Sequence, residues 1–260
     1  MEIMIIFFTV CIVSAIGLLF YMYKLAFEDR VVYHTLEFPS FSPSFGTIHL
    51  FFISDIHRRR ISDSIIEEVK GKVDVVIIGG DLLEKGVPLD RVEENILKLK
   101  TLGPVLFVWG NNDYEMDAQV LDAMLHNLDV KVLANRSILF QSDAGDPLYV
   151  IGLDELSLER DHLETAMEGI EPNSFKILVC HNPEISRKIE PQYGINLLLS
   201  GHTHGGQIRF FGFGPYEKGR IKREKELTIL ISNGYGTTGV PLRLGAKSEI
   251  HYISIKHRSR

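Results

Sequence analysis

Residues 49–57 read HLFFISDIH, residues 73–81 read VDVVIIGGD and residues 105–113 read VLFVWGNND. Each of these segments is a short run of β-branched and aromatic residues that ends in a polar turn, which is typical of a buried strand. A segment with helical periodicity follows each one, at residues 62–70, 88–102 and 117–128. Strands that alternate with helices in this way form largely parallel sheets covered on both faces. The expected fold class is therefore α/β.

The second half of the chain contains many expected strands and few helices. Strands are expected at residues 130–133, 137–140, 148–153, 175–180, 195–200, 227–232 and 249–255. One helix is expected near residues 160–168, with Gly169 as its stop signal. Residues 30–38 alternate in the manner of an edge strand and precede a loop rich in proline and serine. We therefore expect a second sheet or a mixed region within a single soluble domain.

The N-terminal segment, residues 3–23, contains no charged side chain. A helix of about 20 apolar residues is long enough to cross the hydrocarbon core of a bilayer. A cleaved signal peptide would carry a positive charge before the apolar run, whereas Glu2 precedes this one. A buried core helix is the other alternative. We favour an uncleaved transmembrane anchor over residues 1–25, an edge strand and juxtamembrane loop over residues 26–46, and a soluble domain over residues 47–260.

The charges of the chain bear on its location and its partners. Lys24 and Arg30 follow the apolar segment and no cation precedes it, which favours a cytoplasmic soluble domain held at the cell membrane by a single-pass anchor. The net charge of −6 argues against broad binding to nucleic acid, because such binding depends on Lys and Arg. The lipid bilayer is thus an expected partner and no specific nucleic acid is expected. The sequence leaves the oligomeric state open.

Side chains that bind metals follow five of the expected strands. They are Asp55 and His57, Asp81, Asn111, His181, and His202 with His204. The carboxyl ends of parallel strands meet at one edge of a sheet, where open α/β sheets build their ligand sites. Seven carboxylate, amide and imidazole donors suit two divalent cations about 3.5–4 Å apart, an arrangement that serves phosphoryl displacement. The sequence therefore predicts a two-metal site.

The ordered motifs D-x-H, G-D, G-N, H and G-H-x-H between residues 48 and 204 resemble those of the calcineurin-like metallophosphoesterase superfamily. The resemblance implies a four-layer sandwich of two mixed β-sheets flanked by helices. More narrowly, CHNPE at residues 180–184, GHTHGGQ at 201–207 and NGYGTTGVPLRLG at 233–245 resemble a bacterial membrane-associated or exported phosphodiesterase branch. That branch includes lipid-active pyrophosphatases similar to UDP-diacylglucosamine pyrophosphatase.

The resemblance also implies a division of the ligands between two ions. Asp55, His57, Asp81 and His204 would hold the first metal, and Asp81, Asn111, His181 and His202 would hold the second. Manganese, iron or zinc all suit such ligands, and manganese is favoured. The implied activity is hydrolysis of a phosphodiester or pyrophosphate bond by a metal-bridging hydroxide, on a phosphoester substrate that is lipid-linked. The alternative substrate is a nucleotide or nucleic acid.

Asn112 departs from the family motif, which usually carries histidine at this position. An amide still donates a hydrogen bond but cannot give up a proton, so we expect full activity only on good leaving groups. A catalytically impaired metal-binding protein is the alternative. Arg58 directly follows the D-x-H motif and is a candidate for contact with a substrate phosphate, the other interpretations being a solvated loop or contact with anionic lipid.

A loop at residues 205–216 joins the G-H-x-H motif to a dense group of aromatic residues. Such residues are usually buried in a core, and this is the interpretation that we favour over contact with an acyl chain. Asp113 and Asp154 have the chemistry to orient metal ligands, but the sequence does not separate that role from an ordinary loop position.

Overall fold

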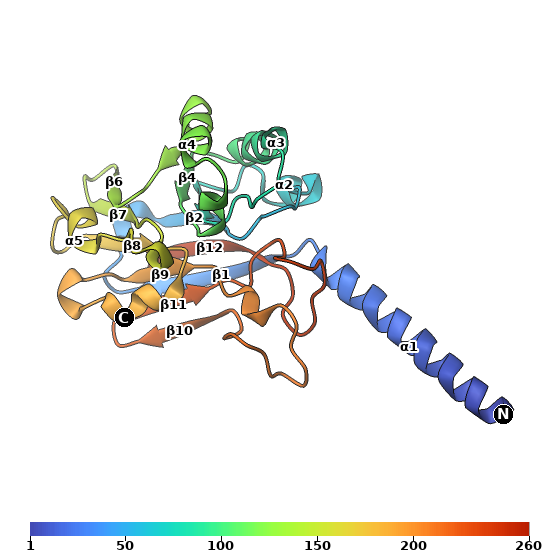
Figure 1. Cartoon of the computed structure of the whole chain (residues 1–260). Coiled ribbons are helices and arrows are strands. Elements are labelled where there is room, and N and C mark those ends of the chain that lie inside the picture. Colours follow the sequence, from blue (N-terminus) through green and yellow to red (C-terminus); the bar gives the residue numbers. More distant parts are fainter. Residues whose placement is uncertain (260) are drawn as a thin grey trace.

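The computed structural model describes residues 1–259 and contains two six-stranded mixed sheets that pack face to face (Figure 1). The first sheet has the strand order β1 (Val31–Phe38), β12 (Ile250–His257), β2 (Thr47–Ile53), β3 (Val75–Gly79), β4 (Val105–Val108) and β5 (Lys131–Val132). The second has the order β10 (Arg220–Glu224), β11 (Leu227–Ile231), β9 (Leu197–Ser200), β8 (Phe175–Val179), β7 (Pro147–Gly152) and β6 (Arg136–Gln141). Strands β2 to β5 are parallel, as are β7, β8, β9 and β11. The expected α/β sandwich is confirmed.

The core lies in three layers because the buried strands are apolar on both faces. In β2, Phe51 and Ile53 pack against the helices, whereas Leu50 and Phe52 pack between the two sheets. Successive side chains of a strand point to opposite faces, so a continuous apolar run is what a doubly covered strand requires. A third apolar cluster covers the outer face of the second sheet.

Helices α2 (Asp63–Val69), α3 (Leu89–Lys100) and α4 (Ala118–Asn127) cover the outer face of the first sheet. The side chains of Ser62 and Asp117 cap two of these helices by accepting hydrogen bonds from the backbone N–H groups of Ser64 and Gln119. These elements agree with the expected segments, and the bounds differ by one or two residues. The helix expected at residues 160–168 is shorter, since α5 covers only Leu163–Ala166.

Strand β10 was not among the expected strands. It reads RIKRE and pairs with β11 in an antiparallel hairpin at the edge of the second sheet. Four of its five residues are charged, so it shows neither an apolar run nor a regular alternation. Only the backbone pairing with β11 defines it as a strand.

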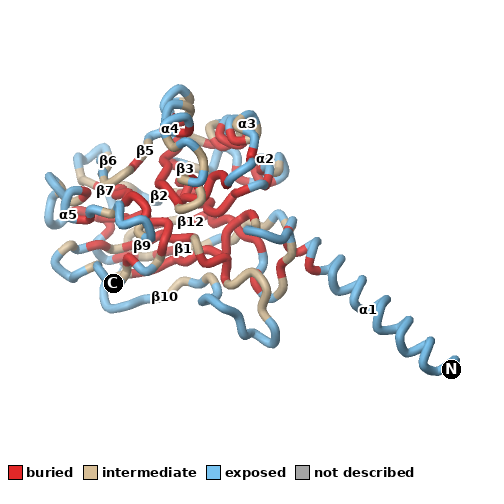
Figure 2. Tube along the Cα trace, in the orientation of Figure 1, coloured by how far each residue is buried: buried red, intermediate tan, exposed pale blue. Residues whose placement is uncertain are grey.

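Helix α1 (Glu2–Ala26) extends away from the sheets and is exposed over almost its whole length (Figure 2). Only Met22, Leu25 and Ala26, in its last turns, are buried. The buried-core alternative is therefore wrong, and α1 is long and apolar enough to cross a membrane. Strand β1 follows it and lies at the edge of the first sheet, paired with β12.

Two buried arginines hold the last turns of α1 against the domain. The Arg59 guanidinium donates to the carbonyls of Ala26 at 3.4 Å and Phe27 at 2.8 Å. It also stacks 3.7 Å from the ring centroid of Tyr235. The backbone N–H of Arg243 donates to the Met22 carbonyl at 3.0 Å. The C-terminal end of α1 is thus part of the folded domain.

Candidate metal centre

The topology brings all seven expected ligands to one end of the sandwich. Strands β2, β3 and β4 of the first sheet end just before Asp55 and His57, Asp81 and Asn111, and strands β8 and β9 of the second end just before His181, His202 and His204. The carboxyl ends of these parallel strands lie together, which is the position expected for a ligand site in such a sheet. The site therefore lies across the junction of the two sheets.

The backbone at these strand ends is unusual. Five of the expected ligands have positive φ angles: Asp55 at 54°, His57 at 50°, Asp81 at 51°, His202 at 70° and His204 at 48°. Residues other than glycine rarely adopt this conformation, and such positions concentrate at functional sites. The turns thus hold their side chains inward at a conformational cost.

Two glycines of the motifs allow the turns to approach one another. A Cβ atom at Gly110 would lie 2.3 Å from the Asp81 Oδ1 atom, and one at Gly201 would lie 2.4 Å from Asp55 Oδ2. Both distances are far inside van der Waals contact, so a side chain at either position would displace a carboxylate of the site. The close approach explains why glycine precedes Asn111 and His202.

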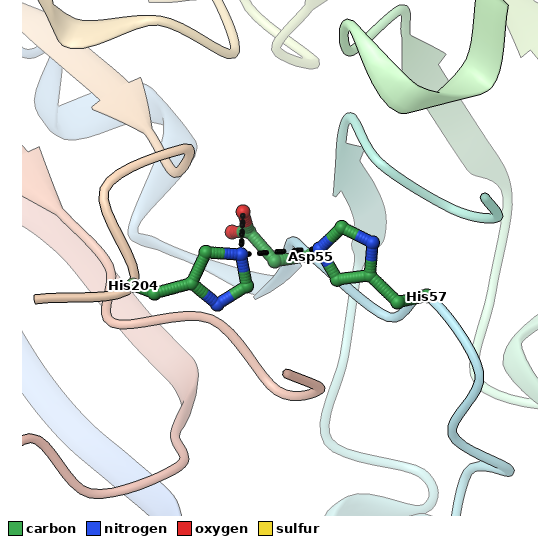
Figure 3. Close-up of side chains that lie close together, drawn as sticks. All are labelled: Asp55, His57 and His204. Atoms are coloured by element: carbon green, nitrogen blue, oxygen red, sulfur yellow. Dashed lines mark hydrogen bonds and ion pairs between the residues drawn. The ribbon is translucent and has the colours of Figure 1, made fainter. Parts of the chain in front are cut away.

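One group of ligands consists of Asp55, His57 and His204, whose side chains point toward one another (Figure 3). The His204 Nε2 atom lies 3.1 Å from His57 Nε2 and 3.3 Å from Asp55 Oδ1. All three side chains are buried, and Asp55 Oδ2 has no hydrogen-bond partner. Two ring nitrogens and a carboxylate converge here with one carboxylate oxygen unpartnered, and this donor set fits a cation.

The second group consists of Asp55, Asp81 and His181. The Asp81 Oδ2 atom lies 3.2 Å from His181 Nε2 and 3.7 Å from His57 Nε2, so Asp81 lies between the two groups. His181 Nδ1 lies 2.8 Å from the Gly79 carbonyl, which accepts a hydrogen bond from the protonated Nδ1 and so leaves Nε2 available as a ligand. His181 Nε2 has no hydrogen-bond partner, so this donor set also fits a divalent ion.

Asn111 and His202 adjoin these groups. The Asn111 Oδ1 atom lies 3.0 Å from His202 Nδ1, and the His202 backbone N–H donates to Asp55 Oδ1 at 3.0 Å. The Asn111 amide donates to Asn112 Oδ1 at 3.1 Å, which turns its carbonyl oxygen toward the cluster. The side-chain amide of Asn112 in turn donates to Glu115 Oε1 at 2.8 Å. Asn112 therefore orients Asn111 in addition to lining the cleft beside the cluster.

Burial and the surrounding charges set the protonation of the ligands. Burial raises the pKa of Asp81, but His181 and His57 outweigh it and lower the pKa below its usual value. Burial lowers the pKa of His204 to about 3 against the opposing charge of Asp55, with Arg243 adding to the decrease. An ionised carboxylate and a neutral imidazole are the forms that bind metals.

The sequence did not identify two residues that hold the ligand histidines. Glu84 Oε2 lies 3.2 Å from His57 Nδ1, and Arg243 Nη2 lies 3.3 Å from His204 Nδ1. Arg243 is fully buried and also donates to the carbonyls of Asn233 and Gly236 at 2.6 Å each. Glu84 lies in an ordinary polar turn. Arg243 belongs to the motif at residues 233–245, but that motif did not indicate a contact with His204, which is 39 residues away.

Asp113 ties two of the ligand turns together. Its carboxylate accepts hydrogen bonds from the backbone N–H groups of Asp81 at 2.9 Å, Gly110 at 2.8 Å and Leu83 at 3.1 Å. It is fully buried, and burial together with the nearby Asp81 carboxylate raises its pKa to about 7. Asp154, by contrast, accepts hydrogen bonds from Tyr114 and Arg160.

Arg58 does not line the cleft beside the ligands. Its guanidinium pairs with Glu84 and donates to the Lys85 carbonyl at 2.9 Å, and its side chain is largely exposed. Through Glu84, Arg58 adjoins the His57 ring from outside the cluster. In this conformation, Arg58 pairs with the Glu84 carboxylate, which in turn contacts the His57 ring.

A cleft of about 370 Å³ opens over the ligands, lined by Asp81, Asn111, Asn112, His202, Thr203, His204, Gly206, Gln207, Pro215, Tyr216 and Thr238. A neighbouring hollow of about 420 Å³ shares His202, Thr203 and Tyr216 with it and includes Arg187 and Lys222. A cavity of about 470 Å³ beside Glu190 and Asn196 is larger but holds none of the ligands. The candidate metal ligands therefore line the first cleft, and the side chains of Arg187 and Lys222 line the adjoining hollow.

The chain is similar to several known proteins. It is 44% identical to the uncharacterized protein YpbG of Bacillus subtilis over 94% of each chain. It is 29% identical to a transmembrane protein with metallophosphoesterase domain from Bos taurus, over 85% of this chain and 56% of that one. The fold is similar to that of a 5'-nucleotidase precursor from Thermus thermophilus, with a TM-score of 0.52 and 13% identity over 80% of this chain and 55% of that one. This chain thus spans little more than half of the last two proteins.

The sequence model of the calcineurin-like phosphoesterase family matches residues 48–206. This range is more than half of the chain and contains every expected metal ligand. The family and the donor set together imply divalent metal ions. The chain therefore belongs to the calcineurin-like phosphoesterase family.

Proposed function

We propose that the protein is a membrane-anchored phosphoesterase that binds two divalent metal ions and hydrolyses a phosphodiester or pyrophosphate bond. The observation that carries the proposal is the buried cluster in which unpartnered atoms of Asp55 and His181 face further carboxylate and imidazole donors. Two divalent ions held by these residues would supply Lewis acidity and would lower the pKa of a water bound to them toward neutral pH. Manganese, iron and zinc all suit this donor set.

The seven expected ligands divide naturally between two ions. Asp81 Oδ2 is near both His57 and His181, which supports its assignment as the carboxylate shared by the two ions. Asn111 and His202 complete the set beside His181 through their contact at 3.0 Å.

The surroundings of the cleft support a substrate with more than one charged group. Arg187 and Lys222 line the hollow that adjoins the cleft, where a second phosphate or another anionic group would compete for them with their present partners, Glu184 and Glu224. Arg58 is a less direct candidate for this contact because it does not line the cleft and Glu84 holds its guanidinium. A lipid-linked phosphodiester or pyrophosphate is the proposed substrate class, and a nucleotide is the alternative.

The proposed location is the cell membrane, with α1 as an uncleaved anchor and the folded domain on the cytoplasmic side. The length and apolar composition of α1 support the anchor, and Lys24 and Arg30 at its C-terminal side support the orientation. Protease treatment of intact and opened cells tests the orientation. Cleavage of the domain in intact cells would overturn it.

The activity is tested on the full chain in detergent with manganese and bis-p-nitrophenyl phosphate. Asp81→Asn is expected to abolish hydrolysis, because it weakens the carboxylate between the two groups of ligands. Asp122→Asn, at an exposed position on α4, is the matched control and is expected to match the wild type. Equal rates for the wild type and Asp81→Asn would overturn the proposal.

A second candidate function is metal binding without efficient catalysis. It is favoured by Asn112, whose side-chain amide is engaged with Glu115 and cannot supply a proton. This alternative predicts that calorimetry detects manganese binding. It also predicts that neither an activated nor an unactivated diester is hydrolysed.

A further inference from the structure

The loop at residues 207–216, here called the aromatic loop, exposes most of its large side chains. Phe211 is 100% exposed, Phe213 81%, Phe210 61% and Tyr216 58%. The expectation that these residues pack in a core is therefore wrong. Four exposed aromatic side chains on one short loop form a concentrated apolar surface, and such surfaces mark interaction sites.

The base of the aromatic loop adjoins the membrane helix. Gln207 accepts a hydrogen bond from the Leu244 backbone N–H at 2.9 Å, and the Arg209 N–H donates to the Leu244 carbonyl at 2.7 Å. The next residue toward the N-terminus, Arg243, donates its backbone N–H to Met22 of α1 at 3.0 Å. In Figure 1 the loop, in orange, projects beyond β10 on the side of the domain from which α1 leaves. The loop and the helix therefore share one end of the molecule.

The segment around the loop is basic in an otherwise acidic chain. Residues 207–225 contain six Lys or Arg residues and two Glu residues, whereas the whole chain has a net charge of −6. Strand β10 contributes Arg220, Lys222 and Arg223 to this charge, of which Arg220 pairs with Glu217 and Lys222 with Glu224. Aromatic rings beside cations are the combination that binds the interface of a membrane containing anionic lipid.

We propose that the aromatic loop is a second membrane contact, in which its phenylalanine side chains enter the bilayer interface beside α1 and β10 lies over anionic headgroups. The loop also lines the cleft, through Pro215 and Tyr216, together with His202 and His204. Insertion of the loop would bring the cleft opening to the level of the lipid headgroups. This last consequence rests on the proposed function, whereas the membrane contact itself does not.

The contact is tested with a fluorescent probe on the full chain in vesicles of phosphatidylcholine and phosphatidylglycerol. Cys11 is replaced by Ser, Cys180 is buried and protected from labelling, and Phe211→Cys carries a nitrobenzoxadiazole label. Val120→Cys on α4, also an exposed apolar position, is the matched control. The label at position 211 is expected to shift to shorter wavelength and to be quenched by lipids brominated on their acyl chains, and the label at position 120 is not.

Absence of quenching at both positions would overturn the proposal. A blue shift at position 211 without quenching by brominated lipid would also overturn it, because it would mean that a second copy of the chain covers the loop. The measurement reports position and not hydrolysis, so a failure of membrane contact and a failure of the proposed activity are observed separately.

Discussion

Asn112 contacts Asn111 and also lines the cleft, so its substitution tests how the leaving group is protonated. Its Oδ1 atom orients the Asn111 amide, and its position in the cleft is one where related motifs carry histidine. Asn112→His is expected to raise the rate on an unactivated diester by up to about 10²-fold and to change the rate on an activated diester little, because general-acid help matters only for poor leaving groups. Steady-state kinetics on both substrates measures the difference.

The control for this substitution is Asn127→His, at an exposed position at the end of α4. It is expected to change neither rate. An equal gain or an equal loss on both diesters in Asn112→His would contradict a missing general acid.

Arg243 is a positioning residue, since its guanidinium contacts His204 while its backbone holds α1. Arg243→Lys keeps the charge but loses the planar set of donors, so the carbonyls of Asn233 and Gly236 lose partners. Loss of such outer contacts typically weakens metal binding about 10–100-fold. Manganese titration by calorimetry is expected to show this loss, and Arg136→Lys, at an exposed position, is expected to show none. A lower melting temperature with unchanged affinity would show a purely structural role.

At the scale of elements, the last turns of α1 are needed for a stable domain. A chain that begins at Arg30 lacks the Ala26 and Phe27 carbonyls and the Asp29 carboxylate that accept from Arg59. Removing the partners of a buried charge typically costs about 3–5 kcal/mol. The free energy of unfolding in urea is expected to be lower by roughly this amount than for a chain that begins at Tyr21. Equal values for the two chains would show that α1 does not stabilise the domain.

The pairing of β1 with β12 makes stability depend on pH. His251 on β12 lies 3.0 Å from His34 on β1, and burial lowers its pKa from 6.5 to about 3. Between these two values His251 is protonated in the unfolded chain and neutral in the folded one. The stability that neutral His251 allows is therefore fully present above about pH 6.5 and decreases as the pH falls toward 3. The slope contributed by one such group is at most about 1.4 kcal/mol per pH unit.

His251→Gln is expected to remove this part of the slope, which urea unfolding at a series of pH values between neutral and mildly acidic would measure. His126→Gln, at an exposed position on α4, is the control. A slope that is unchanged in His251→Gln would assign the acid sensitivity to other groups.

The strands that carry the metal ligands were predictable because two signals coincide at each one. Apolar runs such as HLFFISD end in turns that carry donors, and parallel topology places those turns together. Glu84 was not predictable, and the motif that contains Arg243 did not indicate its role, because both roles arise from contacts across the folded chain. Strand β10 escaped prediction because its mostly charged residues show no apolar pattern, and the exposure of Phe211 follows from tertiary structure alone.

At the scale of the whole molecule, metal binding is expected to stabilise the fold. Asp55 and Asp81 are buried close together, and bound divalent ions would offset their repulsion. Removal of metal with a chelator is expected to lower the melting temperature, and excess manganese to restore it, as measured by differential scanning calorimetry. Asp81→Asn is expected to reduce the response to the chelator. An unchanged melting temperature would mean that the cluster binds metal too weakly to stabilise the domain.

The position of β12 between β1 and β2 has a consequence for biosynthesis. Residues 250–257 are synthesised about 200 residues after the strands with which they pair, residues 31–38 on one side and residues 47–52 on the other. Chains are synthesised at about 5–20 residues per second, so the first two strands wait roughly ten seconds or more for their shared neighbour. During that interval α1 would already be available to the membrane insertion machinery. The first sheet is therefore completed only after β12 has been synthesised, when α1 has long been available for insertion.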